Sequence, residues 1–186
     1  MRRRLLQIDA GGRVLAAAQV PSPNFDQRPA GVDVSLIVVH GISLPPGRFG
    51  GKAISRLFTN RLNPASHPYF ASVAGIRVSA HFLIRRDGAL QQFVDCSARA
   101  WHAGASAFDG RSNCNDFSIG IELEGTDERP YTSNQYRMLS RLIAALRARY
   151  PIRDVAGHSD IAPGRKTDPG PAFDWRRVRR GERCVG

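Results

Sequence analysis

The order of strand and helix patterns is the feature that most restricts how this chain can fold. VSLIVVH, at 34–40, is a β-branched run of strand length, and FSIGIELEG, at 117–125, alternates apolar and polar residues as a strand does. Residues 78–94 predict two strands joined at an Asp-Gly turn, which favours a hairpin. Residues 132–150 predict a long helix with an apolar stripe, and 52–58 predict a short one. This alternation predicts an α/β fold with a mixed β-sheet flanked by α-helices.

The long helix carries its own start and stop signals. Thr132 can cap the first turn, and Gln135, three residues later, completes a capping box. Pro151 ends the helix because proline lacks the amide donor. The apolar stripe consists of Tyr136, Leu139, Leu142, Ile143 and Leu146.

No internal repeat or linker divides the chain. We therefore expect a single domain over residues 1–186, with a core at about 20–178. VAGH, at 155–158, predicts one more short strand. Residues 1–32 are expected to form a lead-in, and residues 176–186 a basic C-terminal tail.

The charge balance is strongly basic. Lys and Arg number 27 against 16 Asp and Glu, which gives a formal net charge of +11. Such a field attracts polyanions or acidic small molecules. The arginines are scattered except at the two ends, and no helix-turn-helix or zinc-finger spacing appears. We therefore predict no nucleic-acid partner, and no obligate protein partner is evident.

Cysteine usage and hydropathy bear on the compartment. The three cysteines, Cys96, Cys114 and Cys184, are odd in number and form no C-x-x-C pair, which favours reduced thiols. No run of 18 apolar residues exists, so no membrane-spanning helix is predicted. The arginine-rich start is interrupted by polar residues and glycines, which argues against a secretory signal. We expect a cytoplasmic protein with no membrane association.

Three separated residues are candidates for a metal site. His40 and His158 each follow an apolar strand pattern and precede loops rich in glycine and proline, and Asp168 lies ten residues after His158. Two imidazoles and one carboxylate form a three-ligand zinc set with a fourth position open to water. A zinc ion in such a site activates water near neutral pH. Alternatively, His40 is a capped strand-end residue and Asp168 a turn former before Pro169, and spacing alone leaves both interpretations open.

Two charged residues could assist this chemistry. Glu122 shares a strand face with Glu124, and it could accept a proton from water if that face lines the metal. It could equally lie on the solvated outer face of an edge strand. Lys166 could place an ammonium against a developing oxyanion, or it could be one more surface cation of a basic protein.

The remaining histidines give weaker signals. His102 follows Trp101 in RAWHAG, a pairing that suits a cleft for sugar or peptide and equally suits a buried corner. His81 lies within a strand pattern, where a histidine with satisfied hydrogen bonds is expected more often than a ligand. His67 precedes Pro68 in a loop and carries no further signal.

Five segments together resemble the N-acetylmuramoyl-L-alanine amidase family of peptidoglycan recycling. The segments are VVHGISLPPGRFGG, RVSAHFLIRRDG, RAWHAG, CNDFSIGIELEGTD and GHSDIAPGRKTDPGPAFDW. The resemblance runs from about Val20 to Trp175, in the same order and with similar spacing. It implies a mixed sheet packed by helices, a fold shared with peptidoglycan-recognition proteins and phage-type amidases. The implied substrate is a 1,6-anhydro-N-acetylmuramyl peptide, cleaved between the lactyl group and L-alanine.

The resemblance also implies roles for individual residues. His40, His158 and Asp168 fall on the Zn²⁺ ligands of the family. Glu122 falls on the carboxylate that activates water, and Lys166 on the amine that stabilises the tetrahedral intermediate. The expected substrate contacts are Arg77, Trp101 and Arg165. A non-catalytic module that binds peptidoglycan fragments is the alternative, although such relatives usually lack one member of the complete set.

Two positions depart from the pattern of the family. Gly41 stands where relatives commonly have Asn, and Asn113 stands where they often have Arg. The resemblance implies that both positions touch substrate. Peptide preference is therefore left open, whereas the predicted metal set is complete.

Overall fold

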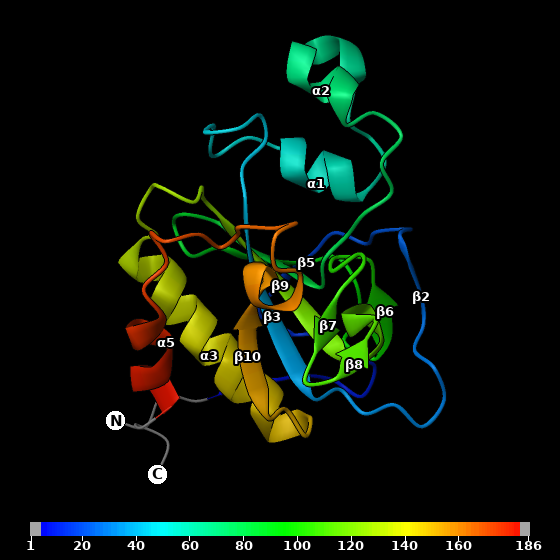
Figure 1. Ribbon diagram of the computed structural model, residues 1–186, viewed down its shortest axis with the longest axis vertical. Coiled ribbons are helices and arrows are strands. Elements are labelled where there is room, and N and C mark those ends of the chain that lie inside the picture. Colours follow the sequence, from blue (N-terminus) through cyan, green and yellow to red (C-terminus); the bar gives the residue numbers. More distant parts are fainter. Residues whose placement is uncertain (1–4, 183–186) are drawn as a thin grey trace.

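The structure is a computed structural model, and it describes residues 5–182 of the chain. Its centre is a six-stranded sheet with the order β1-β5-β4-β9-β3-β10 (Figure 1). The strands are β1 (Ala18–Gln19), β3 (Leu36–Ile42), β4 (Phe82–Ile84), β5 (Leu90–Gln92), β9 (Ser118–Glu124) and β10 (Asp154–Gly157). β4 and β5 pair antiparallel, as the hairpin signal predicts, and the other neighbours pair parallel. The predicted mixed sheet is confirmed.

Helices and two small strand pairs surround this sheet. The helices are α1 (Ala53–Phe58), α2 (Pro68–Ser72), α3 (Ser133–Arg149), α4 (His158–Ile161) and α5 (Trp175–Glu182). The short 3₁₀ turns are η1 (Pro64–Ser66) and η2 (Cys114–Asp116), and the paired strands are β2 (Phe25–Gln27) with β6 (Ala98–Ala100) and β7 (Ala107–Phe108) with β8 (Arg111–Ser112). Figure 1 shows α3 and α5 together on one side of the sheet and the β7–β8 pair on the other.

The helix α3 forms as its sequence predicts. The Thr132 hydroxyl accepts from the amide of Gln135 at 3.2 Å, and the Gln135 side chain accepts from the amide of Thr132 at 3.0 Å. The predicted apolar stripe is buried against one face of the sheet. The sheet residues in this layer are Ile37, Val39, Ile119, Ile121 and Leu123. Packing of this face against α3 leaves the opposite face of β3 and β9 for the polar groups.

The strand β9 lies at the centre of the sheet, between β4 and β3. All seven of its residues are buried, including the polar ones at alternate positions. The interpretation of Glu122 as a residue on the solvated face of an edge strand is therefore wrong. The alternation in the sequence separates an apolar layer from a buried polar layer.

The predicted core starts too late in the chain. Leu6, Val14 and Ala17 belong to the main hydrophobic cluster, so the first residues are part of the core rather than a lead-in. At the other end, Val178, the last residue of the predicted core, is buried, and the expected tail begins as the helix α5, which extends to Glu182. Residues 183–186 of that tail lie outside the described residues.

The structure of residues 5–182 bears on two predictions, the absence of a membrane-spanning helix and the presence of free thiols. None of the helices in this range is both long and apolar enough to cross a bilayer. Cys96 and Cys114 are buried free thiols, as expected, and Cys184 lies outside the described residues. Burial raises the pKa of Cys96 to about 12, so this thiol stays protonated and unreactive.

Candidate metal centre

His40 reaches the site from the middle of the sheet. It lies within β3, which continues to Ile42, so the interpretation of His40 as a strand-end residue is wrong. The parallel register places His40 beside Glu122 of β9. Residues paired in this way project from the same face of a sheet. Both side chains are therefore on the face that α3 does not cover.

His158 is brought to His40 by the neighbouring strand. β10 runs parallel to β3, with Gly157 opposite Val39, and His158 follows as the first residue of α4. Asp168 comes from the irregular segment after α4. Its carbonyl accepts from the amide of Ser159 at 2.9 Å, which ties this segment to the start of α4.

The three candidate ligands converge on one point. His40 Nδ1 lies 3.0 Å from His158 Nδ1, and each of these nitrogens lies 3.2 Å from Asp168 Oδ2. The side chains of His40 and His158 are 2% and 5% exposed, whereas that of Asp168 is 17% exposed. The cluster is therefore open to solvent mainly on the side of Asp168.

The chemistry of these atoms fits a divalent cation. His158 Nε2 lies 3.2 Å from the carbonyl of Ala103, and because a carbonyl only accepts, this nitrogen carries the proton. A neutral imidazole then presents a bare lone pair at Nδ1, toward the cluster. Two imidazole nitrogens and a carboxylate oxygen within 4.8 Å of one another suit zinc, and also other divalent ions that accept nitrogen ligands.

The protonation states also suit a metal. Burial lowers the pKa of His40 to about 4, so its imidazole is neutral at neutral pH. Burial alone would raise the pKa of Asp168, but its hydrogen bonds with His158 and His40 outweigh this and lower it. Neutral imidazoles and an ionised carboxylate are the forms that bind metal ions.

Glu122 stands beside this cluster with one oxygen unused. The residue is 8% exposed, and its Oε2 has no hydrogen-bond partner within the described part of the chain. Burial, followed by the charge of Asp168, raises the pKa of Glu122 well above its ordinary value. A buried carboxylate with a free oxygen and a raised pKa is suited to accepting a proton.

Lys166 and Arg165 lie on the exposed segment between α4 and Asp168. The charge of Lys166 acts on both His40 and Glu122, so this exposed ammonium lies near the cluster. Arg165 Nη2 donates to the carbonyl of Ala103 at 2.7 Å and to that of Ala105 at 2.6 Å. Arg165 thus holds the loop whose Ala103 carbonyl orients His158.

The other two predicted substrate contacts differ in position. Trp101 is half-buried, and its backbone bonds to Ser79, directly before His102 of the site. Arg77 is exposed and lines a pocket formed by α1 and the residues after α2, among them Leu57 and Ile76. Trp101 therefore precedes a residue that contacts His40, whereas Arg77 lies in a pocket lined by residues outside the cluster.

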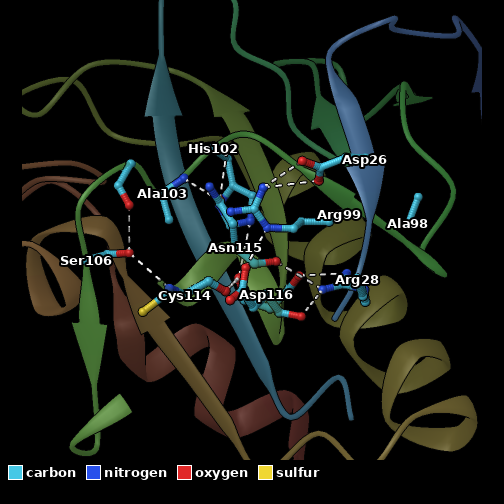
Figure 2. Close-up of polar contacts among 12 residues, drawn as sticks. Asp26, Arg28, Ala98, Arg99, His102, Ala103, Ser106, Cys114, Asn115 and Asp116 are labelled. Carbon is cyan, nitrogen blue, oxygen red and sulfur yellow. Dashed lines mark hydrogen bonds and ion pairs between the residues drawn. The ribbon is translucent and has the colours of Figure 1, made fainter. Parts of the chain in front are cut away.

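One residue of this site was not resolved by sequence reasoning. His102 is buried, and its Nδ1 lies 2.9 Å from His40 Nε2. Its backbone is held by Asn115, whose side-chain oxygen accepts from the amides of His102 at 3.1 Å and Ala103 at 2.8 Å (Figure 2). A signal did exist: Gly120 interrupts the β9 pattern, and glycine inside a strand often marks a close approach. A Cβ at Gly120 would lie 2.4 Å from the His102 ring.

Comparison with known proteins shows the family to which this chain belongs. The sequence profile described as N-acetylmuramoyl-L-alanine amidase matches residues 30–171. The 1,6-anhydro-N-acetylmuramyl-L-alanine amidase AmpD of Citrobacter freundii is 57% identical over 170 residues, which cover 90% of this chain and 91% of that protein. This chain belongs to the N-acetylmuramoyl-L-alanine amidase family.

Solved structures of family members support the same assignment. A crystal structure of a selenomethionine AmpD derivative superposes with a TM-score of 0.92 at 56% identity, covering 94% of this chain and 98% of that one. The amidase AmiD of Escherichia coli has been solved in complex with its substrate, anhydro-N-acetylmuramic acid-L-Ala-D-γ-Glu-L-Lys. It superposes with a TM-score of 0.60 at 26% identity, over 94% of this chain and 65% of AmiD. The predicted resemblance is confirmed.

The two expected departures from the amidase family have local structural reasons. A Cβ at Gly41 would lie 2.3 Å from the Tyr131 hydroxyl, so Tyr131 occupies the space that a side chain at position 41 would need. Asn113 has a φ of 57°, in the left-handed region. Asparagine is enriched in this region, where arginine is less favourable. Each departure thus fits the backbone and packing of this chain.

Proposed function

We propose that this chain is a zinc-dependent amidase of peptidoglycan recycling. It hydrolyses the amide bond between the lactyl group of 1,6-anhydro-N-acetylmuramic acid and L-alanine of muropeptides, in the cytoplasm. The observation that carries this proposal is the pairing of the His40–His158–Asp168 cluster with the unpartnered buried oxygen of Glu122. The similarity to AmpD and AmiD supports the substrate class.

The three clustered residues would hold the metal. His40, His158 and Asp168 would bind zinc through Nδ1, Nδ1 and a carboxylate oxygen. A zinc ion supplies a Lewis acid that polarises the scissile carbonyl and makes water more acidic. The ligands leave solvent access on the side of Asp168, and the exposed Lys166 precedes Asp168 by two residues.

Glu122 would then transfer the proton of the attacking water, and Lys166 would stabilise the negative charge that develops on the substrate. Glu122 accepts a proton from the attacking water, and its raised pKa lets it return that proton to the amine of L-alanine as the C–N bond breaks. Lys166 faces the oxyanion that forms on the lactyl carbonyl. One such donor contributes about 3 kcal/mol to catalysis. The hydroxyl of water ends on the lactyl carboxylate, and the amine leaves with the peptide.

Charge and three side chains would guide the substrate to the site. A muropeptide carries several carboxylates, which a chain of net charge +11 attracts. Trp101 would offer an aromatic surface beside the cluster. Arg165 would present the remaining N–H groups of its guanidinium from the segment between α4 and Asp168, and Arg77 would reach more distant peptide carboxylates from its exposed position.

Incubation with an anhydro-muropeptide tests the function directly. Mass spectrometry should detect free stem peptide, and elemental analysis should find one zinc per chain. Glu122→Gln should retain zinc but lose turnover, because the amide cannot accept the proton. If Glu122→Gln keeps its turnover, Glu122 is not the base. Binding of the muropeptide without cleavage by the wild-type protein would instead support a non-catalytic recognition module.

Glu124→Gln provides a matched control on the same strand face. Glu124 is also buried, but both of its oxygens have partners. Oε1 accepts from the amide of Gly50 at 2.7 Å and from Arg85 Nη1 at 3.1 Å, and Oε2 accepts from the amide of Arg86 at 3.3 Å. Its replacement should lower stability and leave turnover close to that of the wild type. Equal loss of turnover in both variants would show that a buried carboxylate on β9, rather than Glu122 itself, is what activity requires.

A further inference from the structure

A chain of hydrogen bonds runs from the backbone near η2 to the outer nitrogen of His40. The Ser118 hydroxyl lies 2.5 Å from the carbonyl of Cys114. His102 Nε2 lies 3.2 Å from the same hydroxyl, and His102 Nδ1 lies 2.9 Å from His40 Nε2. All of the side chains in this series are buried, so water does not compete for their protons.

The donor and acceptor of each hydrogen bond in this series follow from the first bond, between Ser118 and Cys114. The Cys114 carbonyl has no proton, so the Ser118 hydroxyl must donate to it at this distance. Ser118 then has only lone pairs left for His102, so His102 Nε2 carries the proton. A neutral imidazole has one N–H, which leaves His102 Nδ1 as an acceptor. His40 Nε2 must therefore donate to it, and His40 Nδ1 presents its lone pair to the cluster.

We propose that Ser118 and His102 are positioning residues that fix the tautomer of His40 in its metal-binding form. This inference rests on the proposed metal site, and it assigns these two residues no contact with substrate. Second-sphere partners of this kind orient the ring and raise the basicity of the ligating nitrogen. His158 reaches the same tautomer by a shorter route, through the Ala103 carbonyl.

The small residues of β9 leave room for this series of hydrogen bonds, which we call the relay and which links the Cys114 carbonyl, Ser118, His102 and His40. Ser118, Gly120 and Glu122 alternate along one face of the strand. Gly120 leaves the room that the His102 ring fills, since an added Cβ would lie 2.4 Å from that ring. One face of β9 therefore supplies the hydroxyl that accepts from His102, the space for the His102 ring and the proposed base Glu122.

The first test is zinc affinity measured by chelator competition on the purified full chain. Ser118→Ala removes the acceptor for His102 and should weaken zinc binding about 10- to 100-fold. Ser22→Ala is the matched control, because Ser22 is also buried and also donates at 2.5 Å to a carbonyl, that of Phe58. It should leave zinc affinity within about twofold. Equal affinities of the Ser118→Ala variant and the wild type would overturn the proposal.

A pair of isosteric variants tests the acceptor at position 102. His102→Asn can still accept from His40 Nε2, whereas His102→Leu has a similar shape and no acceptor. Zinc affinity should follow the order wild type, Asn, Leu. Equal affinities of the Asn and Leu variants would contradict the proposed role of the acceptor.

The tautomers of the histidines can be measured by NMR on the zinc-free protein, with no activity assay. Long-range ¹H–¹⁵N correlation spectra of the zinc-free protein should show the proton of His40 on Nε2, and Ser118→Ala should show a mixture of tautomers. An unchanged His40 pattern in Ser118→Ala would refute the relay even where His102 variants do not fold. If the wild type binds no zinc, the proposed function fails; if it binds zinc and Ser118→Ala binds equally well, only the relay fails.

Discussion

The contact between Gly41 and Tyr131 gives a prediction that can be worked from the structure. Tyr131 donates from its hydroxyl to the carbonyl of Pro169 at 3.0 Å, directly after the proposed ligand Asp168. A methyl group at position 41 would lie 2.3 Å from that hydroxyl oxygen, far inside van der Waals contact. Gly41→Ala should therefore displace Tyr131 and break its hydrogen bond to the segment that carries Asp168.

The expected energies come from overpacking and from one buried hydrogen bond. Overpacking of a buried site costs about 1–3 kcal/mol, so Gly41→Ala should lower the free energy of unfolding by that amount. Tyr131→Phe loses its hydrogen bond to Pro169, which costs about 1 kcal/mol. In the double variant the hydroxyl is gone, and the nearest remaining atom, Pro169 Cα, lies at 3.5 Å, an ordinary contact. The double variant should therefore cost about 1 kcal/mol, no more than Tyr131→Phe alone.

Urea unfolding of the metal-free protein measures this cycle. The two single variants and the double variant should give a coupling energy of about 1–3 kcal/mol, with the second substitution rescuing the first. Gly51→Ala is the control, because nothing lies within 4 Å of a Cβ there. Additivity of the two substitutions within about 0.5 kcal/mol would refute the steric argument.

Two further predictions concern charge. Lys166→Ala should lower kcat about 100- to 1000-fold with zinc content unchanged, as expected for one lost oxyanion donor, and an unchanged kcat in steady-state assays would remove Lys166 from the mechanism. Burial, reinforced by Arg28, lowers the pKa of His81 to about 3, so below pH 6.5 the unfolded chain takes up a proton that the folded chain does not. Stability should fall by about 1.4 kcal/mol per pH unit from this residue, from pH 6.5 toward 3, and His81→Asn should remove that part of the slope in urea unfolding at stepped pH. An identical slope in the variant would contradict this.

The elements that the sequence predicts best are those specified by neighbouring residues. The capping box and apolar stripe of α3 are local patterns, and both are present in the structure. The hairpin of β4 and β5 follows from the turn at Asp87-Gly88 for the same reason. The ends of strands are less certain: residues 34–40 predict a strand that the structure places at Leu36–Ile42, because pairing with β9 extends it past His40.

The lead-in shows what local patterns cannot supply. Gln7, Asp9, Gly11, Gly12 and Arg13 interrupt the apolar residues between Leu6 and Val14, so no helix or strand period marks this segment. Leu6 and Val14 are buried because the segment crosses the sheet where Gln92 can bind it: the Gln92 side chain accepts from the amide of Val14 at 2.8 Å and donates to the Gly12 carbonyl at 2.8 Å. Contacts across 78 and 80 residues are invisible to a single sequence.

Glu122 shows a different limit. Alternation of apolar and polar residues indicates that the two faces of β9 differ, but it does not indicate whether the polar face is exposed to solvent or buried. Polar residues at alternate positions predict solvent unless another layer covers them. Here the covering layer includes His102, whose ring fills the space beside Gly120 on this face.

The site itself follows from register more than from spacing. His40 and His102 are 62 residues apart, and His40 and His158 are 118 apart, so no motif length links them. Parallel pairing places His40 and Glu122 opposite each other in adjacent strands, and His158 follows directly after β10, whose last residue, Gly157, pairs with Val39. If β3 shifted by one residue relative to its neighbours, the His40 side chain would point toward α3 and the Val39 side chain toward the cluster. The apolar packing of Val39 and Ile121 against α3 therefore stabilises the polar site on the opposite face, because it excludes that shift.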